Sequence, residues 1–441
     1  MKKKFLLSLV FVFLLISCKD EVVNVINLPS SNQSPLASSF DSKFPVQWMG
    51  LMLDIVTLED IPAPICSRLY GYCQIAIYES VLNGMPDHNS LSGQLRDMPP
   101  MPLPENETYD WPSVLASTLK IVSSTILYQP QQFSLDMIDN LYNDQIAERK
   151  STIDESVVNR SIAYGEEIAN KIIEWSNSDN FLATRNLPFI RPTGNPAYWE
   201  PTTPGVEALE PYLGTQKPFC MSTQGQCTIP LGIAFDTIPG TPFYQDANEV
   251  LQKSQNLTTD EMNIAFFWED KVGTARPPGH WVSITNNMVQ RFSLTLDASA
   301  EIYALVGATI RDAFISAWEA KYRVFLLRPK TYIRRYLGEP NWDPIVNTPP
   351  FPEFPSGHSV VSGGVSRILT YYFGDNIVFT DSTHHNEPGL RNRTFNSFND
   401  AAMEAAWSRL YGGIHFRHAI LYGVDQGRLV ANVVLNTIRL K

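Results

Sequence analysis

Three short motifs near the C-terminal end of the chain combine the residue types that bind a tetrahedral oxyanion. They are Lys321-x6-Arg328-Pro329, Pro355-Ser356-Gly357-His358 and Ser408-Arg409-x5-His415. Together they supply three fixed positive charges, two imidazoles, a hydroxyl and a glycine amide. Arginine suits an anion such as phosphate or vanadate because its guanidinium stays protonated and presents a planar fork of donors. Since the motifs follow one another within 95 residues, from 321 to 415, we predict one shared oxyanion site.

The first motif predicts two cations on one face of a helix. The run from about 300 to 327 has the apolar spacing of a helix and contains no proline. Lys321 and Arg328 are seven residues apart, which is two helical turns and about 10 Å between their Cα atoms. Both long side chains can then reach one anion. Pro329 disfavours helical backbone at Arg328, so we expect the helix to end there.

The second motif lies where a proline-rich loop leads into a predicted helix. Ser356 is a good N-cap residue. The amides at a helix start point outward and favour an anion, and Gly357 lets the backbone approach that anion closely. His358 follows just inside the helix, where it is placed to exchange protons with a bound group.

The third motif needs a break in its helix. Arg409 and His415 would point about 120° apart on one continuous helix. Gly412 and Gly413 predict an interruption that turns His415 back toward Arg409. Taken singly, a Lys/Arg pair is usually a solvated helix face and a histidine near a helix start is usually structural. The prediction therefore depends on the three motifs together.

The K-x6-RP, PSGH and SR-x5-H motifs resemble those of the superfamily that joins type 2 phosphatidic acid phosphatases and vanadium haloperoxidases. Three further blocks look like the haloperoxidase branch: residues 67–81, 198–219 and 264–281. The resemblance covers roughly residues 45 to 440, and is greatest to bacterial enzymes of marine flavobacteria, some of which are iodoperoxidases. It implies an all-α fold in which two helix bundles surround a central vanadate-binding pocket.

The resemblance also implies a role for each motif residue. His415 would bond to vanadium through Nε2, while His358 and Lys321 would be the catalytic groups that act on peroxide. Three cations would neutralise the vanadate oxygens: Lys321, Arg328 and Arg409. Two further donors would hydrogen-bond those oxygens: Ser356 and the amide of Gly357. Trp318 and Phe351 would line the halide side, although both could equally be ordinary core aromatics.

The implied activity is a vanadate-dependent haloperoxidase, which oxidises halide with hydrogen peroxide to hypohalous acid. Iodide is the expected halide because it is the easiest to oxidise, and bromide is the second candidate. The alternative is a secreted acid phosphatase that forms a phosphohistidine at His415, since the same pocket would accept phosphate. A third class is a surface lipoprotein that binds an anion without catalysis.

One departure from the family pattern concerns the residue four positions after His415. Family members often carry an aspartate there, whereas this chain has Ala419. In the phosphatases that carboxylate orients the nucleophilic imidazole, so its loss would harm a phosphatase more than a peroxidase. Asp425 is a candidate substitute, and the way the ring of His415 is held stays open.

Residues 1–17 predict a lipoprotein signal peptide. Three lysines precede a 12-residue run that is apolar at all but one position, which is too short to span a bilayer. The run leads into a lipobox-like sequence, so we expect Cys18 to be lipidated; a plain secretory signal is the alternative. Residues 18–45 are expected to form a flexible tether, which leaves 46–441 as one helical domain. The predicted location is the outer membrane, the cell surface or the periplasm.

Charge and hydropathy limit the possible partners. The net charge of −11 argues against a nucleic-acid partner. No later stretch is apolar enough to cross a membrane, so membrane contact is expected only through the lipid. We expect a monomer whose partners are hydrogen peroxide and halide.

Further residues suggest secondary features. Cys220 and Cys227 could form a disulfide in an oxidising compartment. Cys66 and Cys73 are too far apart on a predicted helix to do so, and are expected to be buried. His280 would lie near the pocket entrance or serve the structure. The His384-His385 pair favours a polar turn over a metal site.

Overall fold

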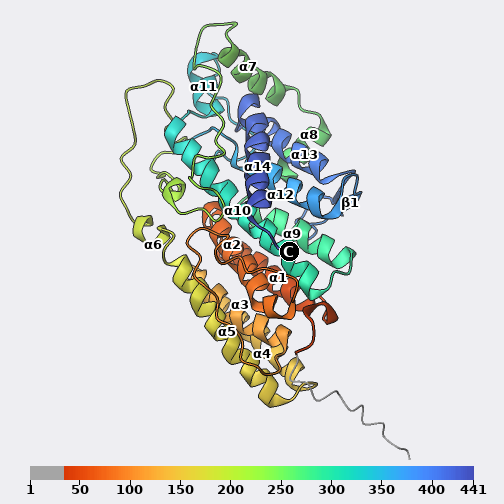
Figure 1. Cartoon of the computed structure of the whole chain (residues 1–441). Helices are drawn as coiled ribbons and strands as arrows, with labels where there is room; N and C mark the ends of the chain where they lie inside the picture. The colour runs from red at the N-terminus through yellow and green to blue at the C-terminus, as the bar shows by residue number, and fades with distance from the viewer. Residues whose placement is uncertain (1–33) are drawn as a thin grey trace, which may run out of the picture.

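The computed structural model describes residues 34–441, and the regular secondary structure in this part of the chain is almost entirely helical (Figure 1). Its two short strands, β1 (Phe379–Asp381) and β2 (Arg393–Phe395), pair antiparallel. The all-α prediction is therefore confirmed. The expected signal peptide and Cys18 lie outside the described residues. Within the described part, no helix has the length and apolarity that a membrane span requires.

The first half of the chain forms one helix bundle, coloured red to yellow in Figure 1. Its helices are α1 (Lys43–Leu58), α2 (Ala63–Val81), α3 (Trp111–Ile126), α4 (Gln132–Lys150) and α5 (Glu155–Ser176). Local sequence sets the helix starts: Asp110 caps α3 by accepting from the amide of Ser113, and Asp154 caps α5 by accepting from that of Ser156. α3 contacts α2, α4 and α5, so it is the centre of this bundle.

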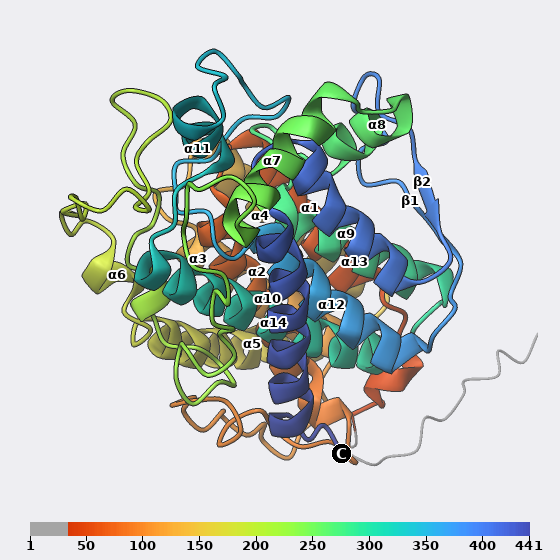
Figure 2. The same ribbon diagram turned by 90° about the horizontal axis from the view of Figure 1, so that it is seen from above.

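The second half forms the bundle that carries the three motifs. Its main helices are α9 (Arg276–Arg291), α10 (Leu296–Val324), α12 (Gly357–Phe373), α13 (Phe398–Tyr411) and α14 (Arg417–Thr437). Shorter helices cover one end: α7 (Pro242–Gln255), α8 (Thr259–Phe267) and α11 (Pro329–Tyr336). In Figure 2, α10, α12 and α14 lie side by side, and all three contact one another.

Glycines allow the central helices to approach closely. α10 packs along α2 and so joins the two bundles. A Cβ at Gly307 would lie 2.7 Å from Cβ of Gln74. A Cβ at Gly427 of α14 would overlap the carbonyl oxygen of Val360 in α12. The motif helix α12 is thus held closely against α14. The N-terminal ends of the two helices also meet, since the amide of Ser356 before α12 donates to the carbonyl of Ala419 in the first turn of α14.

Several predicted boundaries were wrong. The helix predicted from about 300 to 327 is α10, which runs from Leu296 to Val324 and is separated from α9 by a turn through Ser293, whose φ is +50°. The tether was expected to reach residue 45, yet α1 begins at Lys43 and the side chains of Ala37 and Phe44 are buried. The apolar face of α1 accounts for this, since it packs into the core as far as Val56.

The long segment between α6 (Phe181–Thr184) and α7 is mostly irregular, and it is ordered by hydrogen bonds to the core. The buried carboxylate of Asp312 accepts from the amides of Phe219, Cys220 and Met221 at 2.6 to 2.9 Å. Cys220 and Cys227, which could have formed a disulfide, are not bonded in the structure, where all four cysteines of the described residues are free thiols. The carboxylate of Asp312 therefore anchors this turn without a covalent link. Cys66 and Cys73 are buried, as predicted.

Candidate functional site

The three motifs meet at one cavity of about 410 Å³. Its wall includes six of the residues singled out in the sequence: Trp318, Phe351, Gly357, His358, Arg409 and His415. The remaining motif side chains are fully buried around it: Lys321, Arg328 and Ser356. The loop between α8 and α9 also lines the cavity, through Glu269, Asp270 and Lys271.

Lys321 and Arg328 do not share a helix, contrary to the prediction. α10 ends at Val324, and the chain turns through Phe325 in the left-handed region with φ +54°. Arg328 is the N-cap of α11, and Pro329 begins that helix instead of ending one. Proline is favoured at the first helical position because its φ suits the helix and it has no N–H to satisfy there. The turn, and not helical periodicity, brings Arg328 to the site.

The ammonium of Lys321 is held by the proline-rich loop. Its Nζ donates to the carbonyl oxygens of Pro352, Glu353 and Pro355 at 2.9, 3.0 and 2.5 Å. Burial lowers the pKa of Lys321 well below its usual range, and the charge of Arg328 lowers it further. Because an ammonium has three N–H groups, all of them are taken up by the loop. Lys321 therefore contributes positive charge to the site and no free donor.

Arg328 retains a free donor. Its Nε donates to the carbonyl of Phe351 and its Nη1 to that of Ile414, both at 2.9 Å. Nη1 also lies 3.2 Å from Nε2 of His415. The remaining nitrogen, Nη2, is buried without a hydrogen-bond partner. Burial lowers the pKa of Arg328 to about 10, so the side chain stays charged at neutral pH. A buried and unsatisfied guanidinium N–H is costly unless an acceptor meets it.

The second motif folds as predicted. α12 begins at Gly357, and the hydroxyl oxygen of its N-cap Ser356 accepts from the amide of Ser359 at 3.3 Å. The amide of Ser356 donates to the carbonyl of Ala419 at 3.1 Å, which ties this helix start to α14. The positive end of the α12 dipole therefore lies beside the cavity.

The third motif contains the predicted break. α13 ends at Tyr411, Gly413 has φ +80°, and α14 begins only at Arg417. His415 lies in this connection and turns back into the cavity together with Arg409. The Nη2 of Arg409 donates to the carbonyl of Ala265 at 3.1 Å. Burial lowers the pKa of Arg409 to about 10.

Glu353 holds the ring of His415, and sequence reasoning missed it. Nδ1 of His415 lies 2.8 Å from Oε1 of Glu353, and both side chains are buried. Burial, with Arg328 as the largest charge effect, lowers the pKa of His415 well below its usual range, so the ring is neutral. The proton on Nδ1 faces the carboxylate, and Nε2 therefore carries the lone pair. The proposed substitute Asp425 was wrong, since it pairs with Arg428 at 3.1 Å on an exposed face.

A second missed carboxylate faces the other cavity histidine. Nε2 of His358 lies 3.5 Å from Oδ2 of Asp270, and neither atom has a hydrogen-bond partner. Burial lowers the pKa of His358 to about 4, Arg409 contributes to this, and Asp270 opposes it. The sequence offered a weak signal for both carboxylates: Glu353 follows Pro352 in the proline-rich loop three residues before Ser356, and Asp270 is in a block that resembles the family.

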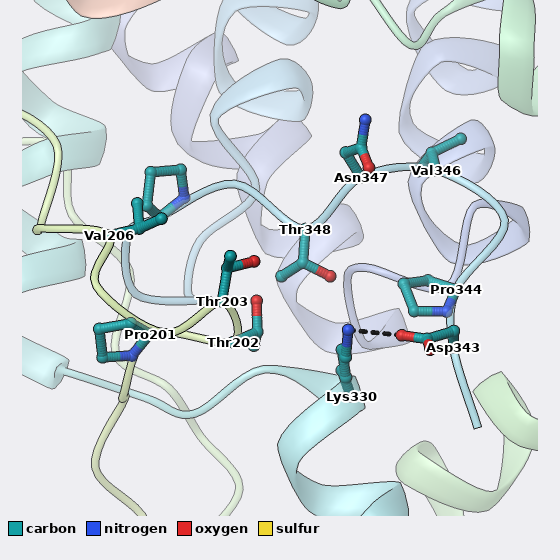
Figure 3. Close-up of a pocket in the computed structure, with 11 residues that line it drawn as sticks. Pro201, Thr202, Thr203, Val206, Lys330, Asp343, Pro344, Val346, Asn347 and Thr348 are labelled. Atoms are coloured by element: carbon teal, nitrogen blue, oxygen red, sulfur yellow. Dashed lines mark ion pairs between the residues drawn. The ribbon is translucent and has the colours of Figure 1, made fainter. Parts of the chain in front are cut away.

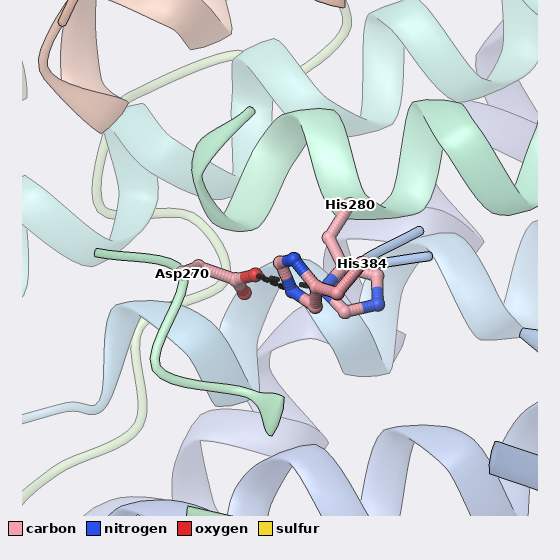
Figure 4. A group of neighbouring side chains, drawn as sticks. All are labelled: Asp270, His280 and His384. Carbon is pink, nitrogen blue, oxygen red and sulfur yellow. Dashed lines mark hydrogen bonds and ion pairs between the residues drawn. The ribbon is translucent and has the colours of Figure 1, made fainter. Parts of the chain in front are cut away.

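Asp270 belongs to a buried cluster of two histidines and two aspartates, three members of which are drawn in Figure 4. Oδ1 of Asp270 lies 2.8 Å from Nδ1 of His280 and 3.2 Å from Nε2 of His384. Nε2 of His280 lies 2.7 Å from Oδ2 of Asp381. Burial alone would lower the pKa of His280, but Asp270 and Asp381 together raise it to about 10.

His280 is thus an imidazolium that donates to a carboxylate at each ring nitrogen. A metal ion between Asp270, His280 and His384 would have to displace one of those hydrogen bonds. The structural alternative for His280 is the correct one, because its side chain is fully buried and does not line the entrance. His384 lies in a turn, as predicted, and its ring points into the cluster.

The two aromatic residues expected on the halide side line the cavity. The ring centroids of Trp318 and Phe351 are 5.0 Å apart. Nζ of Lys321 lies 4.9 Å from the Phe351 centroid, so this apolar wall covers a buried cation. Their contact with halide stays a prediction.

A second hollow lies beside the first and is drawn in Figure 3. Its volume is about 390 Å³, and it shares Asn347, Thr348 and Pro350 with the wall of the motif cavity. Across it, Lys330 and Asp343 form an ion pair at 2.5 Å. None of the predicted site residues lines this hollow.

Comparisons with known proteins agree with this geometry. A family model described as the VCPO second helical-bundle domain matches residues 301–440. The crystal structure of a bacterial vanadium-dependent iodoperoxidase is 32% identical, with a TM-score of 0.84, over 91% of this chain and 97% of that one. A holo bacterial vanadium-dependent chloroperoxidase shares the fold at 16% identity and a TM-score of 0.62, over 92% of this chain and 94% of that one. Vanadium chloroperoxidase of Curvularia inaequalis is 23% identical over 462 residues, which is 80% of this chain and 74% of that protein.

Proposed function

The chain belongs to the vanadium-dependent haloperoxidase family, and on this premise we propose that it is an iodide-oxidising enzyme that binds vanadate at His415. Membership implies hydrogen peroxide and halide as substrates. Iodide is favoured because it is the most easily oxidised of the candidate halides. The similarity to an iodoperoxidase structure at 32% identity supports the same choice.

The observation that carries the proposal is the neutral His415 ring beside three buried cations. Nδ1 of this ring is committed to Glu353, so Nε2 carries the lone pair, which now faces Nη1 of Arg328 at 3.2 Å and would bond a metal. The N–H of Arg328 Nη2 lacks a partner, and the start of α12 adds backbone donors. A metal-centred oxyanion would satisfy the free donors and offset the positive charge. The residues present therefore fit vanadate.

Each residue has a defined task in this proposal. Arg328, Arg409 and the α12 amides would hold the vanadate oxygens. Lys321, which is buried next to the cavity-lining Phe351, would contribute positive charge without contacting them. His415 would hold the metal through Nε2. When bound, vanadate supplies a Lewis-acid centre that makes peroxide oxygen more electrophilic toward halide.

His358 would take a proton from hydrogen peroxide. Its low pKa keeps the ring neutral at neutral pH, so it is available as a base. The carboxylate of Asp270, 3.5 Å away, faces the ring and would stabilise the imidazolium that forms. Trp318 and Phe351 would form the halide side.

One experiment tests the proposal against the phosphatase alternative. Glu353 supplies an orienting carboxylate, so the absence of aspartate at position 419 no longer argues against a histidine nucleophile. Protein freed of vanadium would be incubated with orthovanadate, and peroxide-dependent formation of triiodide would be measured, with bromination and p-nitrophenyl phosphate hydrolysis alongside. We expect triiodide only after vanadate addition, and inhibition of reconstitution by phosphate. Hydrolysis of the ester without halide oxidation would make the protein a phosphatase.

We also propose that the protein is an exported lipoprotein anchored at Cys18. The support is the sequence pattern alone: a short apolar run that ends in a lipobox. Labelling of cells with radioactive palmitate tests it. The wild type should be labelled and Cys18→Ser should not. Labelling of both would contradict the assignment.

A further inference from the structure

We propose that Glu353 is the residue that positions His415 for the metal, in the place of the aspartate that this chain lacks at position 419. The inference builds on the proposed binding of vanadate at His415. It concerns how the chain prepares that ring before any cofactor arrives.

The first argument is the way one carboxylate oxygen serves two donors. Oε1 of Glu353 accepts from Nδ1 of His415 at 2.8 Å and from the backbone amide of Phe416 at 2.9 Å. The ring and the backbone next to it are thereby fixed to the same atom. The imidazole ring therefore has little freedom to rotate about its side-chain bonds. The contact with the carboxylate also determines that Nδ1 carries the proton.

The second argument is that Glu353 is itself firmly placed. Its amide donates to the carbonyl of Leu326 at 2.9 Å, and its own carbonyl accepts from Nζ of Lys321 at 3.0 Å. Phe351, two residues earlier, accepts from Nε of Arg328. The loop from 351 to 355 therefore contacts three of the predicted cofactor residues and links their positions.

The third argument concerns the position where family members often have the aspartate. The side chain of Ala419 is a buried methyl group and carries no acceptor. Its backbone carbonyl accepts from the amide of Ser356, which places it beside the start of α12. Among the described residues, Glu353 is the carboxylate that pairs with His415. The acceptor has therefore moved from α14 to the loop before α12.

The consequence follows from the chemistry of imidazole ligands. A carboxylate on one ring nitrogen fixes the tautomer, orients the ring and makes the other nitrogen a stronger donor to a metal. Loss of such a partner typically costs about 10- to 100-fold in metal affinity. Oε2 of Glu353 is buried without a hydrogen-bond partner, so the whole contribution to His415 comes through Oε1.

The test measures vanadate affinity of the whole protein without reference to activity. The dissociation constant of orthovanadate would be measured by equilibrium dialysis for the wild type, Glu353→Ala, Glu353→Gln and the double variant Glu353→Ala with Ala419→Asp. We expect about 10- to 100-fold weaker binding for Glu353→Ala. Glu353→Gln should lose less because the amide oxygen can still accept from Nδ1. The double variant should regain much of the affinity for vanadate, because it places a carboxylate at position 419, where family members often carry an aspartate.

Asp425→Asn is the matched control. It removes the carboxylate that sequence alone suggested, and that carboxylate pairs with Arg428 on an exposed face instead of with His415. Its affinity should equal that of the wild type. Circular dichroism of each cofactor-free variant would establish that it is folded.

The outcomes separate this inference from the proposed function. If the wild type fails to bind vanadate, the proposed function itself is wrong. If the wild type binds and both Glu353 variants bind equally well, Glu353 has no positioning role. Weak binding by Glu353→Ala together with recovery in the double variant would support it, because a merely structural role of Glu353 in its loop would not be restored by a carboxylate on α14.

Discussion

The two histidines of the cavity meet their carboxylates in different ways. His415 has one carboxylate partner, Glu353, whose Oε1 lies at 2.8 Å and also accepts from a backbone amide. His358 faces Asp270 at 3.5 Å, and Asp270 is shared with His280 and His384. A ring held tightly in one tautomer suits a metal ligand, whereas a ring in looser contact can gain and lose a proton. The geometry thus separates two roles that the residue type leaves open.

The surrounding charge sharpens this difference. Burial lowers the pKa of both rings, but the other main influences differ: for His415 they are Arg328 and Lys321, while for His358 Arg409 is opposed by Asp270. Asp270 therefore partly offsets the lowering of the pKa of His358, whereas the main charges that act on the pKa of His415 are all positive. The same negative charge is held in place by the imidazolium of His280.

Removing the ligand ring should have the largest effect. His415→Ala deletes the Nε2 lone pair, so we expect loss of bound vanadium and complete loss of halide oxidation. Metal content after dialysis against vanadate measures the first, and triiodide formation measures the second. Full activity in this variant would show that His415 is not the metal ligand, and the two histidines could then not be assigned these different roles.

Removing the proton-exchanging ring should cost less. His358→Ala should keep vanadium bound, because the ligand and its carboxylate are untouched. The turnover number should fall by about 10²- to 10⁴-fold, the usual contribution of a positioned acid or base. A matched measurement of vanadium content distinguishes this result from loss of cofactor, which would instead assign His358 to binding.

A smaller effect is expected when the partner of His358 is neutralised. Asp270 raises the pKa of His358, so Asp270→Asn should lower it further below about 4. Since the neutral ring is the base, the acidic limb of kcat/KM should move to lower pH, with a smaller rate at the plateau than in the wild type. A limb that moves to higher pH would show that Asp270 does not act on His358 through its charge.

The smallest effect is on stability. The pKa of folded His280 is raised from 6.5 to about 10, so its stabilising charge is fully present below pH 6.5 and is lost as pH rises through 10. The difference in Tm between cofactor-free wild type and His280→Gln should therefore be largest near pH 6 and shrink toward pH 10. A constant difference over that range would mean that the cluster stabilises the fold without the imidazolium charge.

Local signals in the chain anticipated much of the site. Ser356 caps α12 where the motif predicted it, and Gly412-Gly413 interrupts the helices so that His415 returns to Arg409. The relation between Lys321 and Arg328 was mispredicted, because the end of α10 depends on a left-handed residue, Phe325, that no glycine marks. Proline at 329 is compatible with either a helix end or a helix start, and packing selected the start.

By itself, the sequence determined the residue types at the site, the start of α12 and the break before His415, because caps, prolines and glycines act within about one helical turn. Only the tertiary structure decided which carboxylate faces which histidine. Glu353 and His415 are separated by 62 positions, and His280 and Asp381 by 101. A pairing over such a distance depends on how helices pack, and side-chain spacing carries no information about it.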